Sequence, residues 1–386
     1  MRAERAGTCG MKQLRIHEHF VTLEDPRIER TKRHALMDIV VVAILAVIAG
    51  ADGWDDIEQF ADARLRWLKT FLGMRGGAPC ADTFRRVFAA IDGDKFQHCV
   101  QGWMRELADG LKGKLVAIDG KTVRGSFGDG RGPLHLVSAW VAENSLSLAQ
   151  LAVEDKSNEI VAIPRLLELL DLRGATVTID AMGCQKAIAS AIVGRGADYV
   201  LSLKDNHPTL HAEVADFFEH AEKSGWRDTA HSTHATTDGG HGRVEVRRVW
   251  ASDAIEWLDA TEAWKGLRSV VMVERERMAG EKTSVERAYY LTSCAADAAK
   301  LGDIVRRHWS IENRLHWTLD VTFDEDSCRI RSKNGVQNFA TLRKVALALL
   351  KREPSKAKLS VAQKRKRAGY RTDYLLNVLD GASAAG

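Results

Sequence analysis

Cysteine is scarce in this sequence, and its spacing excludes two kinds of site. Six cysteines are scattered over 386 residues without a C-x-x-C pair. Neither a zinc site nor a disulfide framework is therefore predicted. We expect a chain that works in a reducing compartment, the cytoplasm.

Long hydrophobic runs are also missing. The longest covers Ile39 to Ala51, thirteen residues, whereas a membrane-spanning helix needs roughly 20. No secretory cleavage pattern lies near the first residues. We interpret the run as a buried helix and expect no membrane partner.

The chain as a whole carries little excess charge, yet its charge is unevenly placed. The net charge is +4, but Arg329 to Arg371 holds fourteen Lys or Arg against one acid, Glu353. That segment therefore carries +13, and the rest of the chain −9. A basic segment of this kind fits a polyanion partner such as DNA, although a solvated basic tail would have the same composition.

Length and composition favour a compact protein of about two or three domains. Hydrophobic residues make up 45% and charged residues 28% of the sequence, which excludes a mainly disordered chain. Residues 12–110 have the apolar spacing of helices, and we expect residues 1–110 to form an N-terminal helical domain. Two short helices around the turn at Gly73–Pro79, with Arg85 and Arg86 on the second, could form a helix-turn-helix that binds DNA, or could be antiparallel helices packed on each other.

From residue 111 the pattern alternates between strands and helices. Predicted strands at 114–119, 134–142 and 147–154 are followed by a helix, a strand at 175–180, a helix and a strand at 198–203. This β-β-β-α-β-α-β order is that of a ribonuclease H-like core, in which a mixed sheet carries helices on its faces. The predicted fold class is therefore α/β.

The remaining boundaries follow from changes in this pattern. We expect residues 111–206 to form the first part of the ribonuclease H-like core and 296–351 its second part. Residues 207–295 are expected to form a β-rich insertion with strands at 243–251, 268–276 and 284–293. A helix is predicted from Ala295 to about Trp317. Residues 352–386 are predicted to be a basic C-terminal tail.

Two acidic residues end apolar strands of the predicted core. Asp119 follows "LVAI" and Asp180 follows "TVTI", and ligands of open α/β sheets bind at the carboxyl ends of strands. An acid in such a position is often only a turn residue. Two of them on neighbouring strands suggest a shared site.

A third acid would complete a site for two divalent cations, Mg²⁺ or Mn²⁺, which prefer hard oxygen ligands. The candidate is Glu312, which shares a predicted helix face with His308, Asn313 and His316. Asp320, Asp324, Glu325 and Asp326 are alternatives. Of these, Asp320 and Asp326 remain the strongest competitors.

Several segments together resemble a known family. They are "DPRIERTKRHALMDIVVVAILAVIAGADGWDDIEQFA", "DTFRRVF", "AIDGKTVRGS", "EIVAIPRLLELLDLRGATVTIDAMGCQKAIA", "ADYVLSLKDNH", "HGRVEVRRV" and "RHWSIENRLHWTLDVTFDED". They span nearly the whole chain and resemble insertion-sequence transposases of the DDE type, the group that includes the H-repeat-associated proteins. A tyrosine-arginine-glutamate-lysine signature found in related transposases is absent, because Val305, His308 and Leu319 stand at the corresponding positions around Glu312.

The resemblance implies a function and a site. It implies a transposase that cleaves the ends of a mobile element and joins their 3′ hydroxyls to target DNA, with Asp119, Asp180 and Glu312 as the catalytic and metal-binding acids. It also implies DNA as partner. A dimer is expected, since two DNA ends must be handled together.

Residues expected to contact DNA surround these acids. For each of them, an ordinary structural role is the alternative explanation. They follow the two strands, open an insertion strand or share the helix of Glu312: Lys121, Arg124, Lys204, Asn206, His241, Arg243, His308, Trp309, Asn313 and Arg314. Loop exposure, turn formation or core packing would explain the same residue types. Two alternative functions stay open: a metal-dependent nuclease without strand transfer, and a non-catalytic DNA-binding relic.

Overall fold

The computed structural model describes residues 16–128, 132–153, 159–240, 243–258, 261–280 and 282–380. The chain divides into two compact units. The first consists of residues 1–107, 123–134 and 318–386, and the second of residues 108–122 and 135–317. Both units are therefore built from segments that are distant in the sequence.

The first unit is helical. Its centre is α2 (Leu36–Ala49), whose side chains from Asp38 to Ile48 are all buried, as predicted for the long apolar run. Helix α2 packs against α12 and α13, and α5 packs against α3 and α12. The α-helices of this unit are α1 (Ile16–Phe20), α2, α3 (Trp54–Ala63), α4 (Leu65–Leu68), α5 (Ala81–Ala90), α6 (Gly93–Ala108), α11 (Trp317–Phe323), α12 (Lys333–Arg352), α13 (Val361–Tyr370) and α14 (Thr372–Asp380).

No single helix among the described residues is long and apolar enough to span a bilayer; α2 and α3 pass such a test only as a pair bent by 98°. The polar Asp38 within α2 is used locally, because its carboxylate accepts hydrogen bonds from the backbone N–H groups of Gly73 and Met74.

The C-terminal segment differs from a solvated tail. It forms α13 and α14, and one of its cations, Arg365, is buried inside the unit. The guanidinium of Arg365 donates to the carbonyls of Val47, Ala51 and Thr322 and to the carboxylate of Asp52. Amino-acid composition alone could not predict this burial, because an arginine is usually exposed. A guanidinium can be buried when several acceptors satisfy its N–H groups.

The second unit is a nine-stranded sheet in the order β3-β2-β1-β4-β5-β9-β8-β7-β6. Strands β1, β4 and β5 are parallel, while β2 and β3 are antiparallel to each other. The strands are β1 (Leu115–Val123), β2 (Leu134–Val141), β3 (Leu146–Val153), β4 (Thr176–Ile179), β5 (Asp198–Leu203), β6 (Ser232–Gly240), β7 (Arg243–Ser252), β8 (Ser269–Ala279) and β9 (Lys282–Thr292). The first five strands confirm the predicted ribonuclease H-like core.

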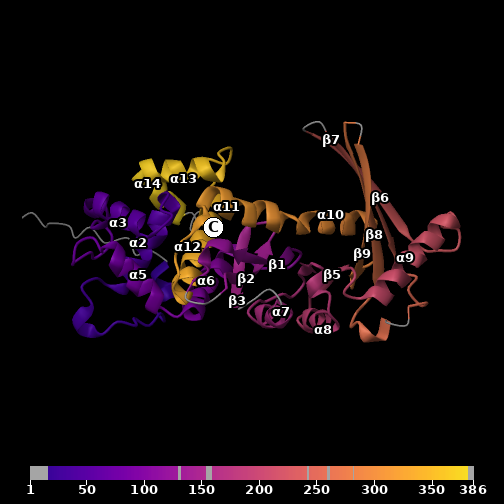
Figure 1. The fold of residues 1–386 in the computed structure, drawn as a ribbon, viewed down its shortest axis with the longest axis horizontal. Coiled ribbons are helices and arrows are strands. Elements are labelled where there is room, and N and C mark those ends of the chain that lie inside the picture. Colours follow the sequence, from indigo (N-terminus) through magenta and orange to yellow (C-terminus); the bar gives the residue numbers. More distant parts are fainter. Residues whose placement is uncertain are drawn as a thin grey trace, which may run out of the picture. The chain divides into compact units, whose positions relative to one another are not determined.

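Helices cover both faces of the core strands. Helices α7 (Glu159–Glu168) and α8 (Lys186–Gly194) lie on one side and α10 (Ala298–His308) on the other (Figure 1). Leu301, Ile304 and Val305 of α10 pack in a hydrophobic cluster with Val249 and Val271 of the sheet. The same cluster includes Leu115 of β1, and α10 also contacts β4, so α10 lies over these two strands.

The predicted insertion continues the core sheet. Strand β9 pairs antiparallel with β5, and β8, β7 and β6 follow, with α9 (Pro208–Lys223) beside β9. The predicted strands at 243–251, 268–276 and 284–293 are confirmed as β7, β8 and β9. Strand β6 was not predicted, because its sequence "STHATTDGG" is polar and contains no apolar alternation.

Candidate active site

Two of the predicted acids lie next to each other at the end of the parallel ladder. The last paired residues of β1 and β4 are Ile118 and Ile179, so Asp119 and Asp180 are the next residues on two neighbouring strands. The Oδ1 atom of Asp180 also accepts from the backbone N–H groups of Met182 and Gly183, in the short 3-10 helix η4 (Ala181–Gly183). Parallel pairing therefore brings both carboxylates to one edge of the sheet.

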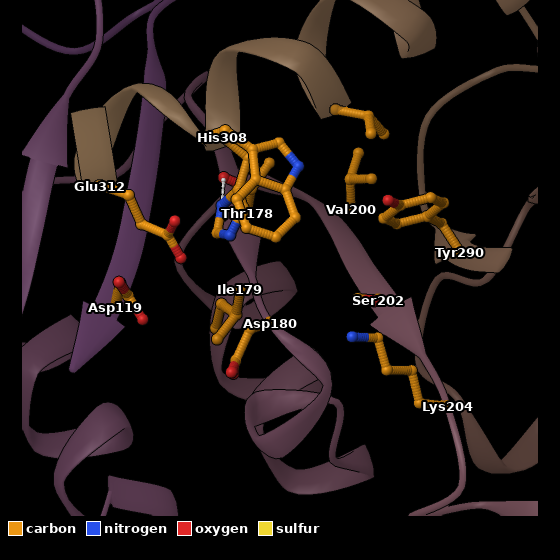
Figure 2. A pocket seen from close by; sticks show the side chains of 12 residues that line it. Asp119, Thr178, Ile179, Asp180, Val200, Ser202, Lys204, Tyr290, His308 and Glu312 are labelled. Atoms are coloured by element: carbon orange, nitrogen blue, oxygen red, sulfur yellow. Dashed lines mark hydrogen bonds between the residues drawn. The ribbon is translucent and has the colours of Figure 1, made fainter. Parts of the chain in front are cut away.

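Glu312 comes from a π-helical segment, η6 (Ile311–His316), between α10 and α11. The predicted single helix over 295–317 is thus interrupted, and π-turns inside helices are frequent at functional sites. Figure 2 shows the Glu312 side chain extending from this segment toward Asp119 and Asp180. All three acids line one pocket of about 110 Å³.

The electrostatics of the pocket show an excess of negative charge. Burial, followed by the charges of Asp180 and Glu312, raises the pKa of Asp119 to about 7. Burial and the Asp180 charge also raise the pKa of Glu312. One imidazole is close, since His316 Nδ1 lies 3.4 Å from Asp119 Oδ2. A bound cation would relieve this repulsion.

The donor chemistry fits Mg²⁺ or Mn²⁺, because three carboxylates supply hard oxygen ligands. Within the ranges that the structure describes, however, no three acidic, imidazole or thiol side chains are grouped closely enough to hold a metal ion. Asp119, Asp180 and Glu312 are the residues of this pocket with the chemistry to hold the ion.

His308 and Lys204 line the same pocket with different chemistry. The His308 Nδ1 atom lies 2.9 Å from Thr178 Oγ1 of β4, and burial lowers the pKa of His308 to about 4. His308 is therefore uncharged near neutral pH and ties the end of α10 to the sheet. Lys204 supplies a cation at the end of β5, and its amine projects into the pocket (Figure 2).

Among the other residues expected to contact DNA, Trp309 lines the pocket and is 44% exposed. Lys121 lies two residues after Asp119 in β1, so both side chains project from the same face of the strand. Asn313 and Arg314 are exposed on η6, where the Asn313 side chain donates to the carbonyl of Trp309. Asn206 has a local role, because its amide donates to the carbonyls of Ala181 and Cys184 beyond Asp180.

The structure gives less support to the remaining expected contacts. Arg124 belongs to the first unit, where its guanidinium lies 3.7 Å from the carboxylate of Asp326. His241 lies outside the described residues. The backbone of Arg243 pairs with Ala279 in the β7–β8 ladder, and its side chain is outside what the structure describes.

The competing acids lie elsewhere. Asp320 is in α11 and Asp326 in the 3-10 helix η7 (Glu325–Ser327), both in the first unit. Of the described residues that line the pocket, the acids are Asp119, Asp180 and Glu312. The pocket therefore favours Glu312 as the third acid.

A second pocket adjoins the first and was not predicted from the sequence. The two pockets share Ser202, Lys204, Tyr290, Val305 and Trp309. Three arginines also line the second one: Arg247 of β7, Arg275 of β8 and Arg306 of α10. Residues 247 and 275 are direct partners across the ladder. Glu286 also lines this pocket. Each arginine is paired with an acid, Arg247 with Glu245, Arg275 with Glu286 and Arg306 with Asp238.

Comparison with known proteins gives matches over nearly the whole chain. Residues 17–104 match the family described as DDE_Tnp_1-associated, and residues 110–349 match the transposase DDE domain. "Putative transposase YncI" from Escherichia coli O157:H7 is 40% identical over 375 residues, covering 96% of this chain and 95% of that protein.

Two further similarities also cover most of the chain. "H repeat-associated putative transposase YhhI" from Escherichia coli K12 is 36% identical over 379 residues, covering 96% of this chain and 99% of that protein. Among solved structures, the piggyBac transposase in a synaptic complex with hairpin DNA aligns with a TM-score of 0.40 and 10% identity, over 95% of this chain and 75% of the other.

Proposed function

Because this chain belongs to the DDE transposase family, we propose that it cleaves DNA at the ends of an insertion sequence and joins those ends to target DNA. One observation carries the proposal. Asp119 in β1, Asp180 directly after β4 and Glu312 in η6 are distant in sequence and line the same pocket. Phosphodiester chemistry by two cations needs such a set of carboxylates.

The three acids would hold Mg²⁺ or Mn²⁺. Two such ions, when bound, activate the attacking oxygen and stabilise the leaving oxygen of a phosphodiester. The chain's own contribution is to place the carboxylates in one pocket at the carboxyl ends of β1 and β4. His316, 3.4 Å from Asp119, would orient that carboxylate.

Cations beside the acids would bind the DNA backbone. Lys204 projects into the pocket, and Lys121 shares a strand face with Asp119. The adjoining pocket adds Arg247, Arg275 and Arg306 next to the rings of Tyr290 and Trp309. Basic residues interleaved with aromatic rings suit a DNA strand with unpaired bases. We therefore propose that this second pocket binds the DNA strand where it extends beyond the catalytic pocket.

Incubation with DNA carrying the element's own ends, a target plasmid and Mg²⁺ tests the proposal. Sequencing of the products should show cuts at the ends and 3′ ends covalently joined to the plasmid. Because two ends must react together, a dimer should assemble on the paired ends. Glu312→Gln is the inactive comparison, and Asp320→Asn the matched active one.

The same experiment separates the alternatives. Cut ends without joined products would indicate a nuclease. Binding without any cut product in Mg²⁺ or Mn²⁺ would indicate a relic. The presence of all three acids in one pocket favours the active enzyme over the relic.

A further inference from the structure

Asp119 lies where β1 loses support from its parallel neighbour. The β1–β4 ladder pairs Leu115 to Ile118 with Thr176 to Ile179 and ends there, while β1 continues to Val123. Asp119 is thus the first residue beyond the ladder. The last part of β1, with the Asp119 carboxylate, is therefore held by β2, its other neighbour in the sheet, and by side chains that pack on the strand.

A buried polar group contacts this part of β1. His135 Nε2 of β2 lies 2.6 Å from Glu159 Oε1, and the two side chains are 3% and 6% exposed. The other imidazole nitrogen of His135 is 2.9 Å from the Thr122 hydroxyl of β1. Glu159 is the first residue of α7, where the helix dipole favours a negative charge.

Gly120 brings the backbone of β1 directly onto this group. A Cβ atom at Gly120 would lie 2.3 Å from Glu159 Oε1 and 2.5 Å from His135 Nε2. No real Cβ makes contacts so short, so only glycine fits beside Asp119 while the histidine and the glutamate keep their places. Since neighbouring residues of a strand project to opposite faces, the buried group supports β1 from the face opposite to Asp119.

The energetics argue against a purely structural pair. Removing two ionisable groups from water is costly, and apolar residues of similar volume often stabilise a fold at least as well. The sheet already sets β1 beside β2. The directed hydrogen bonds through His135 add what apolar packing lacks, a defined position of the start of α7 against both strands.

We propose that His135, Glu159 and Thr122 are positioning residues that fix the end of β1 and thereby preset the Asp119 carboxylate for a divalent cation. This inference rests on the proposed metal-dependent function. Groups that hydrogen-bond to a metal ligand typically change metal affinity about 10–100-fold when removed. We expect the lower end of this range, because these three residues act through the backbone of β1.

Binding of Mn²⁺ to the full-length protein, without DNA, is the test. Free Mn²⁺ is measured by electron paramagnetic resonance, and thermal unfolding is followed in parallel. Glu159→Ala and Gly120→Ala should weaken Mn²⁺ binding about tenfold or more. Glu159→Gln keeps an acceptor for His135, and Thr122→Val removes a single hydrogen bond, so both should weaken binding less. Glu168→Ala, in the same helix and 66% exposed, is the matched control.

The outcomes separate this inference from the proposed function. Absence of Mn²⁺ binding by the wild-type chain would refute the metal site itself. Wild-type binding that is unchanged in folded Glu159→Ala and Gly120→Ala would overturn the positioning role alone, as would an equal loss in Glu168→Ala. If either alanine variant fails to fold, Glu159→Gln and Thr122→Val decide, and unchanged Mn²⁺ affinity in both overturns the inference.

Discussion

The charge of Asp119 should destabilise the metal-free protein, so that Asp119→Asn should stabilise it at neutral and alkaline pH. The pKa of this carboxyl rises from an ordinary 3.8 to about 7, and each pKa unit corresponds to about 1.4 kcal/mol. The ionised form therefore costs the fold up to about 4 kcal/mol. Because the folded-state pKa lies above the unfolded value, stability is full below about pH 4 and is lost as pH rises through about 7.

Thermal unfolding of the wild type and of Asp119→Asn, in EDTA between pH 5 and pH 8, measures this effect. The variant should unfold at a higher temperature than the wild type at both pH values. The difference should be at least about twice as large at pH 8, because at pH 5 only part of the interval between the two pKa values has been crossed. Mg²⁺ should then stabilise the wild type and have little effect on the variant. Asp205→Asn, exposed in the loop after β5, is the control. A variant no more stable than the wild type at pH 8 would refute the reasoning.

Further predictions concern the other acids and the basic segment. Asp180→Asn and Glu312→Gln should abolish metal-dependent cleavage and leave DNA binding, measured by fluorescence anisotropy, nearly intact, whereas Asp320→Asn and Asp326→Asn should keep much of the activity; an active Glu312→Gln would contradict the assignment. Because burial holds the pKa of His308 at about 4, His308→Gln should leave the shape of the pH–rate profile between pH 6 and 8 unchanged. An inflection that the wild type shows in this range and the variant lacks would contradict this prediction. Replacing the exposed Lys356, Lys358 and Lys366 by Gln should flatten the plot of log affinity against log salt by up to about 0.9 for each DNA phosphate that is no longer neutralised; an unchanged slope would exclude these lysines from DNA binding. Arg365→Ala should lower the free energy of unfolding by about 1–3 kcal/mol, as measured by urea denaturation, because it leaves buried carbonyls without their donor. A decrease below about 1 kcal/mol would contradict the burial argument.

The core and the placement of two acids could be predicted because they depend on local pattern. The apolar runs before Asp119 and Asp180 indicated the strands, and the order of elements indicated the parallel neighbours. Neighbouring parallel strands have their carboxyl ends on the same side of the sheet, so topology alone places Asp119 and Asp180 together.

Other features depend on contacts between distant segments and were not predictable. The π-helix at Ile311–His316 has no distinctive sequence, since the same apolar spacing suits an α-helix. Strand β6 exists because β7 offers hydrogen bonds at the sheet edge, and its own side chains give no strand pattern. The burial of Arg365 requires carbonyls from segments more than 300 residues away in sequence.

The support beneath Asp119 escaped prediction for the same reason. His135 and Glu159 lie 24 residues apart and meet only when β2 and α7 pack together. Gly120 in "AIDGK" has the pattern of a turn residue, although the structure explains it by close contact. The need for glycine at this position can be recognised only from the positions of the His135 and Glu159 side chains in the folded protein.

Anomalous diffraction from crystals soaked in Mn²⁺ tests the central claim most directly. We predict density for the cation among the carboxylates of Asp119, Asp180 and Glu312, with ligand bonds near about 2.1 Å. Density held by Asp320 or Asp326, with Glu312 turned to solvent, would contradict the assignment of the site.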